Sequence, residues 1–524
     1  MRKFPFYPVL FSLYIVLFLF AHNFQYLSPH DLYRPMLFVV AGTLLMWTLL
    51  SILYRDWNKG ALLTCVFLML FFSYFLVLLL PFIESVKKLL PSWILHEYYW
   101  ILILILFLPF FGLAYVLKFR KINAQKVNYF FNLMSFFLLL FALGNLVVQN
   151  IPFIQKGVKE SFKLPLPEIK RETPWLRSGK LPDIYYIILD GYGRQDVLRD
   201  LYEFDNSVFL NFLEEKGFFV ARKSFSNYCQ TYLSLASSLN FSYLDWIPEK
   251  YGKEVTGRTP LVRLIRHNRL MRFLKKLGYK VIAFASGYSG TELRRADLYI
   301  RPPGLTEFEN LLLLRTPLGF LSIDRKGGVQ YKLHRQRLLF ILDNIAALPE
   351  EKGPRIVFAH IIMPHPPFVF DSKGNPVNPS RPFSIRDGSH YFAESEETRE
   401  DYRRKYVAQL KFLNRKLESL VSQLLSRDPD AIVILQADHG PGSMLSWETV
   451  EKTDVRERFG ILNAYYLPGR QPDWLWQTIS PVNTFRVILN RYFGTELSYL
   501  PDRAFYSPWL YPYKFVEVTP HLLK

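Results

Sequence analysis

Two stretches of the sequence place residues that commonly bind metal ions directly after mostly apolar runs. Asp190 follows the run 184–189, and Asp438 with His439 follows the run 431–437, with glycine next in both cases. Such runs, rich in β-branched residues and ended by glycine, predict buried strands of a parallel sheet. Ligands bind at the carboxyl ends of these strands, and carboxylate oxygens and imidazole nitrogens are usual ligands for zinc or manganese. We therefore expect a metal site here; a turn aspartate that holds the glycine bend is the alternative for Asp190.

Two histidines accompany a third apolar run, at 355–362. His360 lies inside the run, and His365 follows it in Met-Pro-His-Pro-Pro-Phe. In a metal site outside the cytoplasm, such histidines can bind phosphate oxygens or donate a proton to a leaving group. We expect both to bind substrate, and His365 also to act in catalysis. The alternative for His360 is a buried, hydrogen-bonded side chain.

The candidate nucleophile is Thr231, which we expect at the N-terminus of a helix. Unpaired N–H groups and the helix dipole favour negative charge at that position. A hydroxyl there that also binds a metal is easier to deprotonate and to use in attack on phosphorus. A threonine that only caps the helix is one alternative. The other is Cys229, since a thiol at a helix start can have a lowered pKa.

Alternating helical and strand patterns from residue 181 onward predict the scaffold that positions these residues. Such alternation is typical of an α/β domain with a mostly parallel central sheet and helices on both faces. We expect strands at 184–189, 218–222, 280–285, 355–362, 431–436 and 461–467. We expect helices at 206–216, 261–277, 331–347, 403–425 and 482–492.

The first 150 residues read as a membrane domain. Most of its apolar stretches approach the roughly 20 residues that a helix needs to span a bilayer. The first stretch follows Met-Arg-Lys, but no cleavage site of a signal peptide follows it, so we expect a retained anchor. The sequence therefore predicts five transmembrane helices, at 6–21, 35–54, 61–82, 100–117 and 129–148.

Charged residues between these stretches predict the orientation of the chain. Basic residues fall on alternate sides, as expected for a cytoplasmic N-terminus and a multi-pass protein of a bacterial-type plasma membrane. Residues 151–180, with several prolines and mixed charge, are predicted to form a linker that lies in part at the membrane interface. Residues 181–524 then form an extracytoplasmic catalytic domain.

Charge and cysteine content exclude some classes of partner and site. The net charge is +19, and no recognition helix or RNA-binding signature accompanies it, so we expect an anionic membrane surface or lipid and no nucleic acid. Only two cysteines are present, Cys65 and Cys229. They exclude a disulfide framework and a cysteine-based zinc site in the large domain.

Four motifs, taken in order, resemble the sulfatase-like branch of the alkaline phosphatase superfamily. They are Pro-Asp-Ile-Tyr-Tyr-Ile-Ile-Leu-Asp-Gly at 182–191, Thr-Tyr-Leu-Ser-Leu-Ala-Ser at 231–237, Met-Pro-His-Pro-Pro-Phe at 363–368 and Ala-Asp-His-Gly at 437–440. With five expected spans ahead of the domain, the chain also resembles lipoteichoic acid synthases and lipid A phosphoethanolamine transferases. The resemblance implies an alkaline-phosphatase-like fold.

The resemblance also implies a mechanism. One divalent metal ion (Mn, Zn or Mg) would be held by Asp190, Thr231, Asp438 and His439. Thr231 would attack the headgroup phosphodiester of an anionic phospholipid donor and form a phosphothreonine, and His365 would contact the transferred phosphate group. An envelope glycan or lipid would then accept a phosphoglycerol- or phosphoethanolamine-like group.

Departures from the family pattern decide between its branches. The segment after Cys229 lacks the proline and arginine that formylglycine sulfatases need, and the cysteine pairs of some phosphoethanolamine transferases are absent. We therefore expect a membrane-anchored phosphotransferase. A sulfatase-like hydrolase of sulfate or phosphate esters is the first alternative, and a non-catalytic envelope-assembly protein is the second.

Overall fold

The computed structural model describes most of the chain, and the chain divides into two compact units. The described residues are 4–23, 29–78, 94–121, 124–148, 164–322, 328–349, 352–377, 379, 381, 383–469 and 474–522. The first unit comprises Met1–Lys159 together with Pro303–Asp324, and the second comprises Glu160–Pro302 together with Arg325–Lys524. The first part of the expected linker, 151–163, lies outside the described residues.

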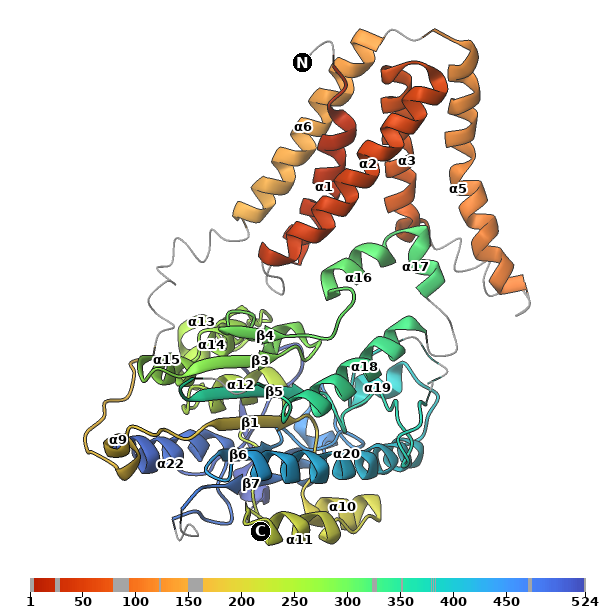
Figure 1. Cartoon of the computed structure of the whole chain (residues 1–524). Coiled ribbons are helices and arrows are strands. Elements are labelled where there is room, and N and C mark those ends of the chain that lie inside the picture. Colours follow the sequence, from red (N-terminus) through yellow and green to blue (C-terminus); the bar gives the residue numbers. More distant parts are fainter. Residues whose placement is uncertain are drawn as a thin grey trace. The chain divides into compact units, whose positions relative to one another are not determined.

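The first unit contains a bundle of apolar helices (Figure 1). Four of them are long and apolar enough to cross a membrane, where the sequence predicted five. Helix α1 is apolar but has only 16 residues, a length of about 24 Å, which is short of the roughly 30 Å hydrocarbon layer. The bundle helices are α1 (Tyr7–His22), α2 (Tyr33–Tyr54), α3 (Trp57–Leu78), α5 (Ile94–Phe119) and α6 (Ala124–Val148).

Two short helices pack with this bundle. In the sequence they follow the first part of the second unit. They are α16 (Glu307–Leu314) and α17 (Pro317–Ser322), and neither is among the helices expected from the sequence. A capping box begins α16: Thr306 accepts from the backbone of Glu309, whose carboxylate accepts from the backbone of Thr306. Phe308 and Leu312 of α16 are buried with Val16 and Phe20 of α1. The membrane bundle therefore includes a segment inserted between two elements of the large domain.

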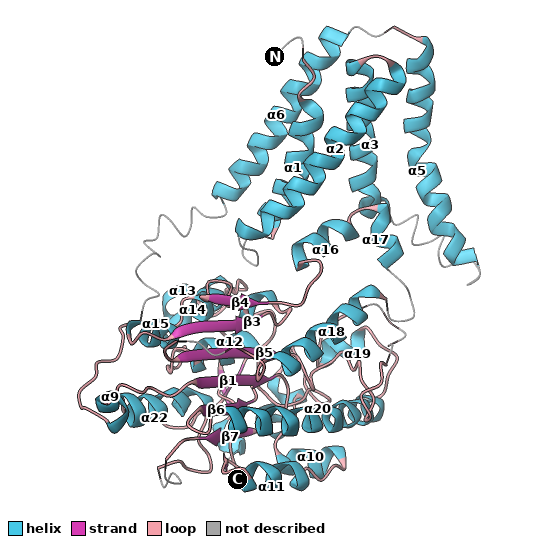
Figure 2. Cartoon of the chain, viewed as in Figure 1, coloured by secondary structure: helices cyan, strands magenta, loops and turns pink. Residues whose placement is uncertain are grey.

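The second unit is built on a seven-stranded, mostly parallel sheet, as the sequence predicted (Figure 2). The strand order is β2-β7-β6-β1-β5-β3-β4; β7 runs antiparallel to both its neighbours and the other pairs are parallel. The strands are β1 (Ile184–Leu189), β2 (Phe219–Val220), β3 (Lys280–Phe284), β4 (Leu298–Ile300), β5 (Arg355–Ile361), β6 (Ile432–Gln436) and β7 (Asn463–Tyr466), with a separate hairpin of β8 (Phe505–Tyr506) and β9 (Val516–Glu517).

Helices cover the sheet on both faces. One segment that was predicted to be a single helix forms two helices. The helix predicted at 261–277 breaks at His267, because Asn268 caps a new helix by accepting from the backbone of Met271 at 2.7 Å. The principal helices are α9 (Pro174–Ser178), α10 (Gln195–Tyr202), α11 (Ser207–Glu215), α12 (Thr231–Ser238), α13 (Trp246–Tyr251), α14 (Thr259–Arg266), α15 (Arg269–Lys276), α18 (Val329–Asn344), α19 (Ser389–Ala393), α20 (Arg399–Arg427), α21 (Val455–Phe459), α22 (Pro481–Phe493) and α23 (Thr519–Leu522).

Strand register brings the chemically interesting positions to one edge of the sheet. In the central strand β1, Ile188 pairs with His360 of β5 on one side and with Gln436 of β6 on the other. All three strands run parallel and are fully buried. Their carboxyl ends therefore lie together, and Asp190, His365 and Asp438 leave the sheet at the same edge.

Candidate metal and catalytic site

Asp190 is fixed at the end of β1 by the backbone and by a histidine behind it. Its N–H donates to the carbonyl of Ile361 at 2.9 Å, and its own carbonyl accepts from the N–H of His365 at 3.0 Å. Its Oδ2 lies 3.1 Å from Nε2 of His360, whose other ring nitrogen is 2.9 Å from the hydroxyl of Thr291. His360 is completely buried. It therefore orients the Asp190 carboxylate from beneath.

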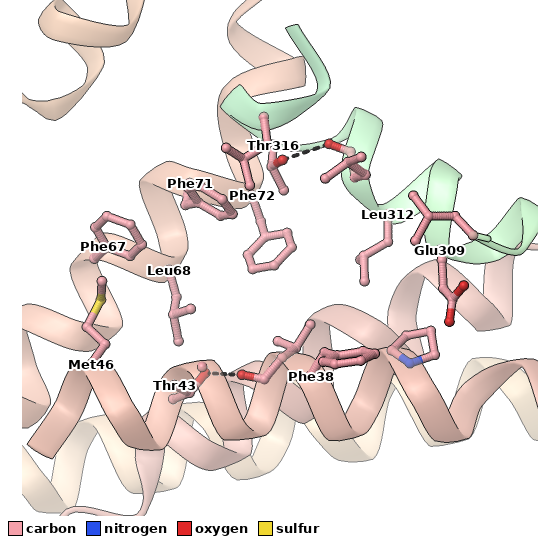
Figure 3. Close-up of a pocket in the computed structure, with 16 residues that line it drawn as sticks. Phe38, Thr43, Met46, Phe67, Leu68, Phe71, Phe72, Glu309, Leu312 and Thr316 are labelled. Carbon is pink, nitrogen blue, oxygen red and sulfur yellow. Dashed lines mark hydrogen bonds between the residues drawn. The ribbon is translucent and has the colours of Figure 1, made fainter. Parts of the chain in front are cut away.

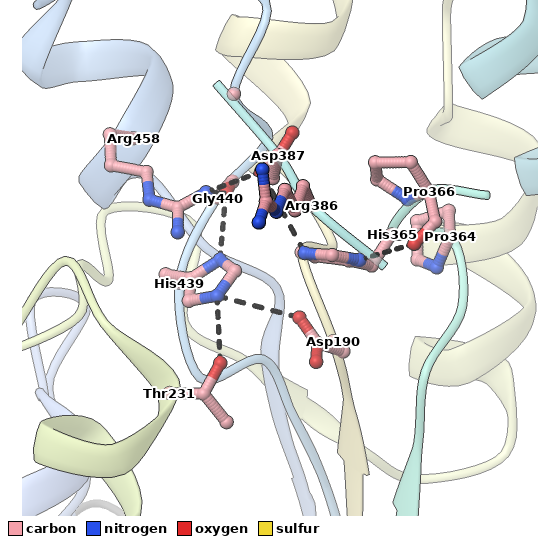
Figure 4. Close-up of polar contacts among 12 residues, drawn as sticks. Asp190, Thr231, Pro364, His365, Pro366, Arg386, Asp387, His439, Gly440 and Arg458 are labelled. Atoms are coloured by element: carbon pink, nitrogen blue, oxygen red, sulfur yellow. Dashed lines mark hydrogen bonds and ion pairs between the residues drawn. The ribbon is translucent and has the colours of Figure 1, made fainter. Parts of the chain in front are cut away.

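His439 presents one bare ring nitrogen to the site. Its Nδ1 lies 2.9 Å from the carbonyl of Gly440, so Nδ1 carries the proton and donates it there. Its Nε2 then faces three oxygens: Thr231 Oγ1 at 3.1 Å, Asp438 Oδ2 at 3.3 Å and Asp190 Oδ1 at 3.4 Å. Figure 4 shows the contacts with Thr231 and Asp190. Burial, and then the charge of Arg458, lower the pKa of His439. This keeps the ring neutral and its nitrogen available as a ligand.

The chemistry of this cluster fits a divalent cation. Ligand atoms of Asp190, Asp438 and His439 all lie within 4.8 Å of one another and are buried. Asp190 Oδ1 and Asp438 Oδ2 accept no hydrogen bond from any described residue. Burial raises the pKa of Asp190, but the nearby His365, His360 and His439 outweigh it, so the pKa lies below its usual value. Ionised oxygens and a bare imidazole nitrogen that converge without donors form a ligand set for zinc or manganese.

Thr231 is the first residue of α12, as the sequence predicted. Its hydroxyl reaches His439 across a sequence separation of 208 residues. The helix N-terminus adds a positive partial charge at the same point. Thr231 also lines a pocket, so its oxygen faces both the ligand cluster and the space that a substrate can enter.

Cys229, the rival nucleophile, is turned away from the cluster. Its thiol is completely buried in an apolar group with Phe225 and Phe459, and its Sγ lies 3.5 Å from the carbonyl of Ser507. Burial raises the pKa of this thiol. Cys229 does not line the pocket. Geometry and protonation therefore both disfavour a reactive thiolate.

The pocket over the cluster has a volume of about 460 Å³. His365 lines it, with Nδ1 2.6 Å from the carbonyl of Pro366 and Nε2 3.9 Å from Asp387 Oδ2. Most of the further lining residues are basic or aromatic, namely Arg386, His390, Arg458, Tyr232, Tyr288, Trp447 and Trp509, and the others are Gln230, Ile362, Ile385 and Asp387. A pocket with this lining suits an anionic group attached to a ring or an apolar chain.

Sequence reasoning missed a buried ion pair at the base of this pocket. Arg458 Nη1 lies 2.8 Å from Asp387 Oδ2 and 3.0 Å from the carbonyl of Gly440. Its Nε and Nη2 donate to the carbonyl of Cys229 at 2.9 and 2.8 Å. Arg458 thus joins the loop before Thr231 to the loop after His439. No local sequence pattern predicts this role of Arg458, because its partners are backbone carbonyls and an aspartate far away in the sequence.

The structure brings most of the predicted site residues together. Asp190, Thr231, Asp438 and His439 meet in one cluster, and His365 lines the pocket above it. His360, for which the sequence predicted contact with substrate, lies beneath Asp190 and does not line the pocket. A buried, hydrogen-bonded histidine was the alternative, and this placement favours it.

A family model described as Sulfatase matches residues 182–479, more than half of the chain. No curated protein matches the sequence. Similar solved structures include the C-terminal periplasmic domain of EptC from Escherichia coli in complex with zinc (12% identity, TM-score 0.43, covering 68% of this chain and 96% of that one). They also include the integral membrane lipooligosaccharide phosphoethanolamine transferase A from Neisseria meningitidis (13%, 0.39, 93% and 95%) and a 2-O GAG sulfatase (15%, 0.41, 61% and 72%).

Proposed function

The chain belongs to the sulfatase family and is a sulfatase-like enzyme of the alkaline phosphatase superfamily. On that premise we propose that it is a membrane-anchored, metal-dependent phosphotransferase. It moves a phosphoglycerol- or phosphoethanolamine-like group from a phospholipid donor to an envelope glycan or lipid. The observation that carries this proposal is the position of Thr231, at a helix N-terminus and 3.1 Å from the bare nitrogen of His439.

The proposed reaction proceeds in two displacements at phosphorus. Thr231 Oγ1 loses its proton to solvent and forms a bond to the headgroup phosphorus; the bond from phosphorus to the lipid alcohol breaks, and the departing oxygen takes a proton from His365. An acceptor hydroxyl then attacks the same phosphorus and releases Thr231, which regains a proton from solvent, while the acceptor's proton returns to His365. A divalent ion held by Asp190, Asp438, His439 and Thr231 would lower the pKa of the hydroxyl and neutralise charge on the phosphate.

Two features of the site favour phosphoryl transfer over sulfate-ester hydrolysis. Threonine stands where formylglycine sulfatases need a modified cysteine or serine, and Cys229 is buried away from the pocket. The basic pocket lining, with Arg386, Arg458 and His365, suits the negative oxygens of a phosphodiester and of a sulfate ester alike, so the nucleophile carries the distinction.

The arrangement of the membrane unit supports a catalytic domain outside the cytoplasm. The turn between α2 and α3 and the turn between α5 and α6 both carry basic residues, and they meet at one end of the bundle. Lys59 Nζ donates to the carbonyl of Leu117 at 2.6 Å, and Asn128 donates to Asn58 at 2.7 Å. Arg55, Lys118, Arg120 and Lys121 flank these contacts in sequence. The positive-inside rule assigns this end to the cytoplasm. Helix α16 packs at the opposite end, beside Phe20 near the end of α1 and Met36 near the start of α2.

An acceptor-dependence experiment tests the proposal. The full-length protein in detergent is incubated with manganese and a phospholipid labelled in its headgroup, with and without an envelope glycan acceptor. We expect label on the acceptor and sustained release of diacylglycerol when acceptor is present, and release that stops after a single turnover of the enzyme when it is absent. Release of the headgroup phosphate into water at the same rate in both reactions would instead establish the hydrolase alternative. No release from any phosphate or sulfate ester, by protein that also binds no metal, would favour the non-catalytic alternative.

A further inference from the structure

The membrane unit contains an apolar pocket with a volume of about 420 Å³ (Figure 3). The first half of α2 and the second half of α3 form two of its walls, and α16 with α17 forms the third. Phe38, Phe67, Phe72 and Leu312 line it, and Phe72 and Leu312 extend into it from α3 and α16 in Figure 3. All of these segments belong to the same compact unit.

The pocket lies in one half of the bundle. Along α2 its lining runs from Pro35 to Met46, a rise of about 17 Å, or roughly half the hydrocarbon layer. This half is remote from the α2–α3 turn, where Lys59 contacts the end of α5. With that turn on the cytoplasmic side, the pocket lies in the outer leaflet.

The polar groups that line the pocket are already engaged. Thr43 Oγ1 donates to the carbonyl of Val39 at 2.7 Å, and Thr316 Oγ1 donates to that of Leu313 at 2.7 Å. Glu309 Oε2 accepts from the backbone of Thr306 at 2.6 Å, and Glu309 Oε1 forms an ion pair with Arg34 at 3.1 Å, although it accepts no hydrogen bond from the described residues. Water inside would therefore find few partners, and a cavity of this size is far larger than the voids of a packed interior. The surrounding medium supplies an apolar occupant, since lipid tails are as apolar as leucine.

We propose that this pocket holds an acyl chain of an outer-leaflet phospholipid. Arg34, whose side chain is about half exposed, lies at the start of α2, where the headgroup phosphate of such a lipid would be. The lipid would contact α16 and α17, which in the chain connect β4 to α18 of the catalytic domain. This inference goes beyond the proposed function, because it assigns a lipid site within the membrane unit itself.

A glycine in the pocket wall allows a sharp test. A Cβ built on Gly42 meets nothing within 4 Å, so Gly42→Leu fills the pocket without a backbone clash. Gly144 of α6 offers the same open space outside the pocket, so Gly144→Leu is the matched control. Leu318→Phe is a second variant that fills the pocket. Leu318 is a half-exposed residue of α17 that lines the pocket wall.

The probe is phosphatidylglycerol with a photoreactive diazirine in its acyl chain, in vesicles of phosphatidylglycerol and phosphatidylethanolamine that contain the full-length protein. After illumination, peptides are mapped by mass spectrometry. We expect labelling of residues 305–318 in the unmodified protein and in Gly144→Leu, and loss of that labelling in Gly42→Leu and Leu318→Phe. No labelling of 305–318 in the unmodified protein, or equal labelling in both filling variants, would overturn the proposal. Labelling needs no turnover, so Thr231→Ala protein gives the same pattern, and failure here is distinct from failure of the proposed reaction.

Discussion

Thr231 Oγ1 lies 3.1 Å from His439 Nε2, the ring nitrogen that the Gly440 carbonyl leaves unprotonated. This contact joins the start of α12 to the turn after β6. The contact places the Thr231 hydroxyl close to two buried carboxylates. One oxygen of each, Asp190 Oδ1 and Asp438 Oδ2, accepts no hydrogen bond from the described residues. A cation that binds there would contact the attacking oxygen directly.

Removal of a ligand should abolish metal binding. We expect Asp438→Ala to lose the bound divalent ion, because one of the converging carboxylates disappears. Glu457→Gln is the control: Glu457 is also fully buried but lies outside the ligand cluster, and a glutamine side-chain oxygen can still accept from Tyr202 and Ser443. Elemental analysis of the dialysed full-length proteins gives the stoichiometry. Retention of a full equivalent of metal by Asp438→Ala would contradict the assignment.

His360 should affect metal affinity without any contact to substrate. Its Nε2 lies 3.1 Å from Asp190 Oδ2, so it orients this ligand. We expect His360→Gln to weaken metal binding by about 10- to 100-fold, the usual effect of losing such a partner. Titration with zinc in competition with a chelator measures the affinity. If His360 binds substrate instead, the variant would raise KM with metal affinity unchanged.

The buried Arg458 should stabilise the fold of the catalytic domain. Arg458→Met leaves Asp387 buried without its ion pair and frees two carbonyls, and we expect a loss of about 3–5 kcal/mol in the free energy of unfolding. Arg456→Met, two residues away, removes only an exposed pair with Asp200 at 2.9 Å, for an expected cost below about 1 kcal/mol. Thermal unfolding compares the two, and equal shifts in Tm would contradict this role for Arg458.

A buried histidine should make stability depend on pH. Burial of His334 and then the charge of Arg337 lower its pKa from 6.5 to about 3, and its ring packs on Phe383. The unfolded chain therefore takes up a proton near pH 6.5 while the folded one stays neutral, so stability falls as pH drops below 6.5. The expected loss is about 2 kcal/mol at about pH 5.

His334→Phe removes this titration, so its Tm should fall less than that of the unmodified protein between about pH 7.5 and about pH 5. His521→Phe, at an exposed position, is the control and should behave like the unmodified protein. An identical pH dependence in His334→Phe would show that other groups control the acid sensitivity.

Local patterns were sufficient to predict the sheet and much of the site. The runs that end at Asp190 and Asp438 are parallel neighbours, and the register of β1 with β5 and β6 brings their ends together. The sequence did not predict the Asp387–Arg458 pair, because it joins a loop residue to the five-residue helix α21 71 positions later, and neither segment is long enough to show a periodic pattern. The sequence did not predict the place of the α16–α17 segment, because the sequence of a short amphipathic helix has the same pattern whether the helix covers a sheet or packs on a membrane bundle.

The most direct test of the central claim is the mass of Thr231 after turnover. The full-length protein is incubated with donor phospholipid and no acceptor, quenched in acid, digested and analysed by mass spectrometry. We predict a phosphoglycerol- or phosphoethanolamine-sized adduct on Thr231, which persists in Cys229→Ala and disappears in Thr231→Ala. An adduct on Cys229, or donor turnover in Thr231→Ala at the unmodified rate, would contradict the account.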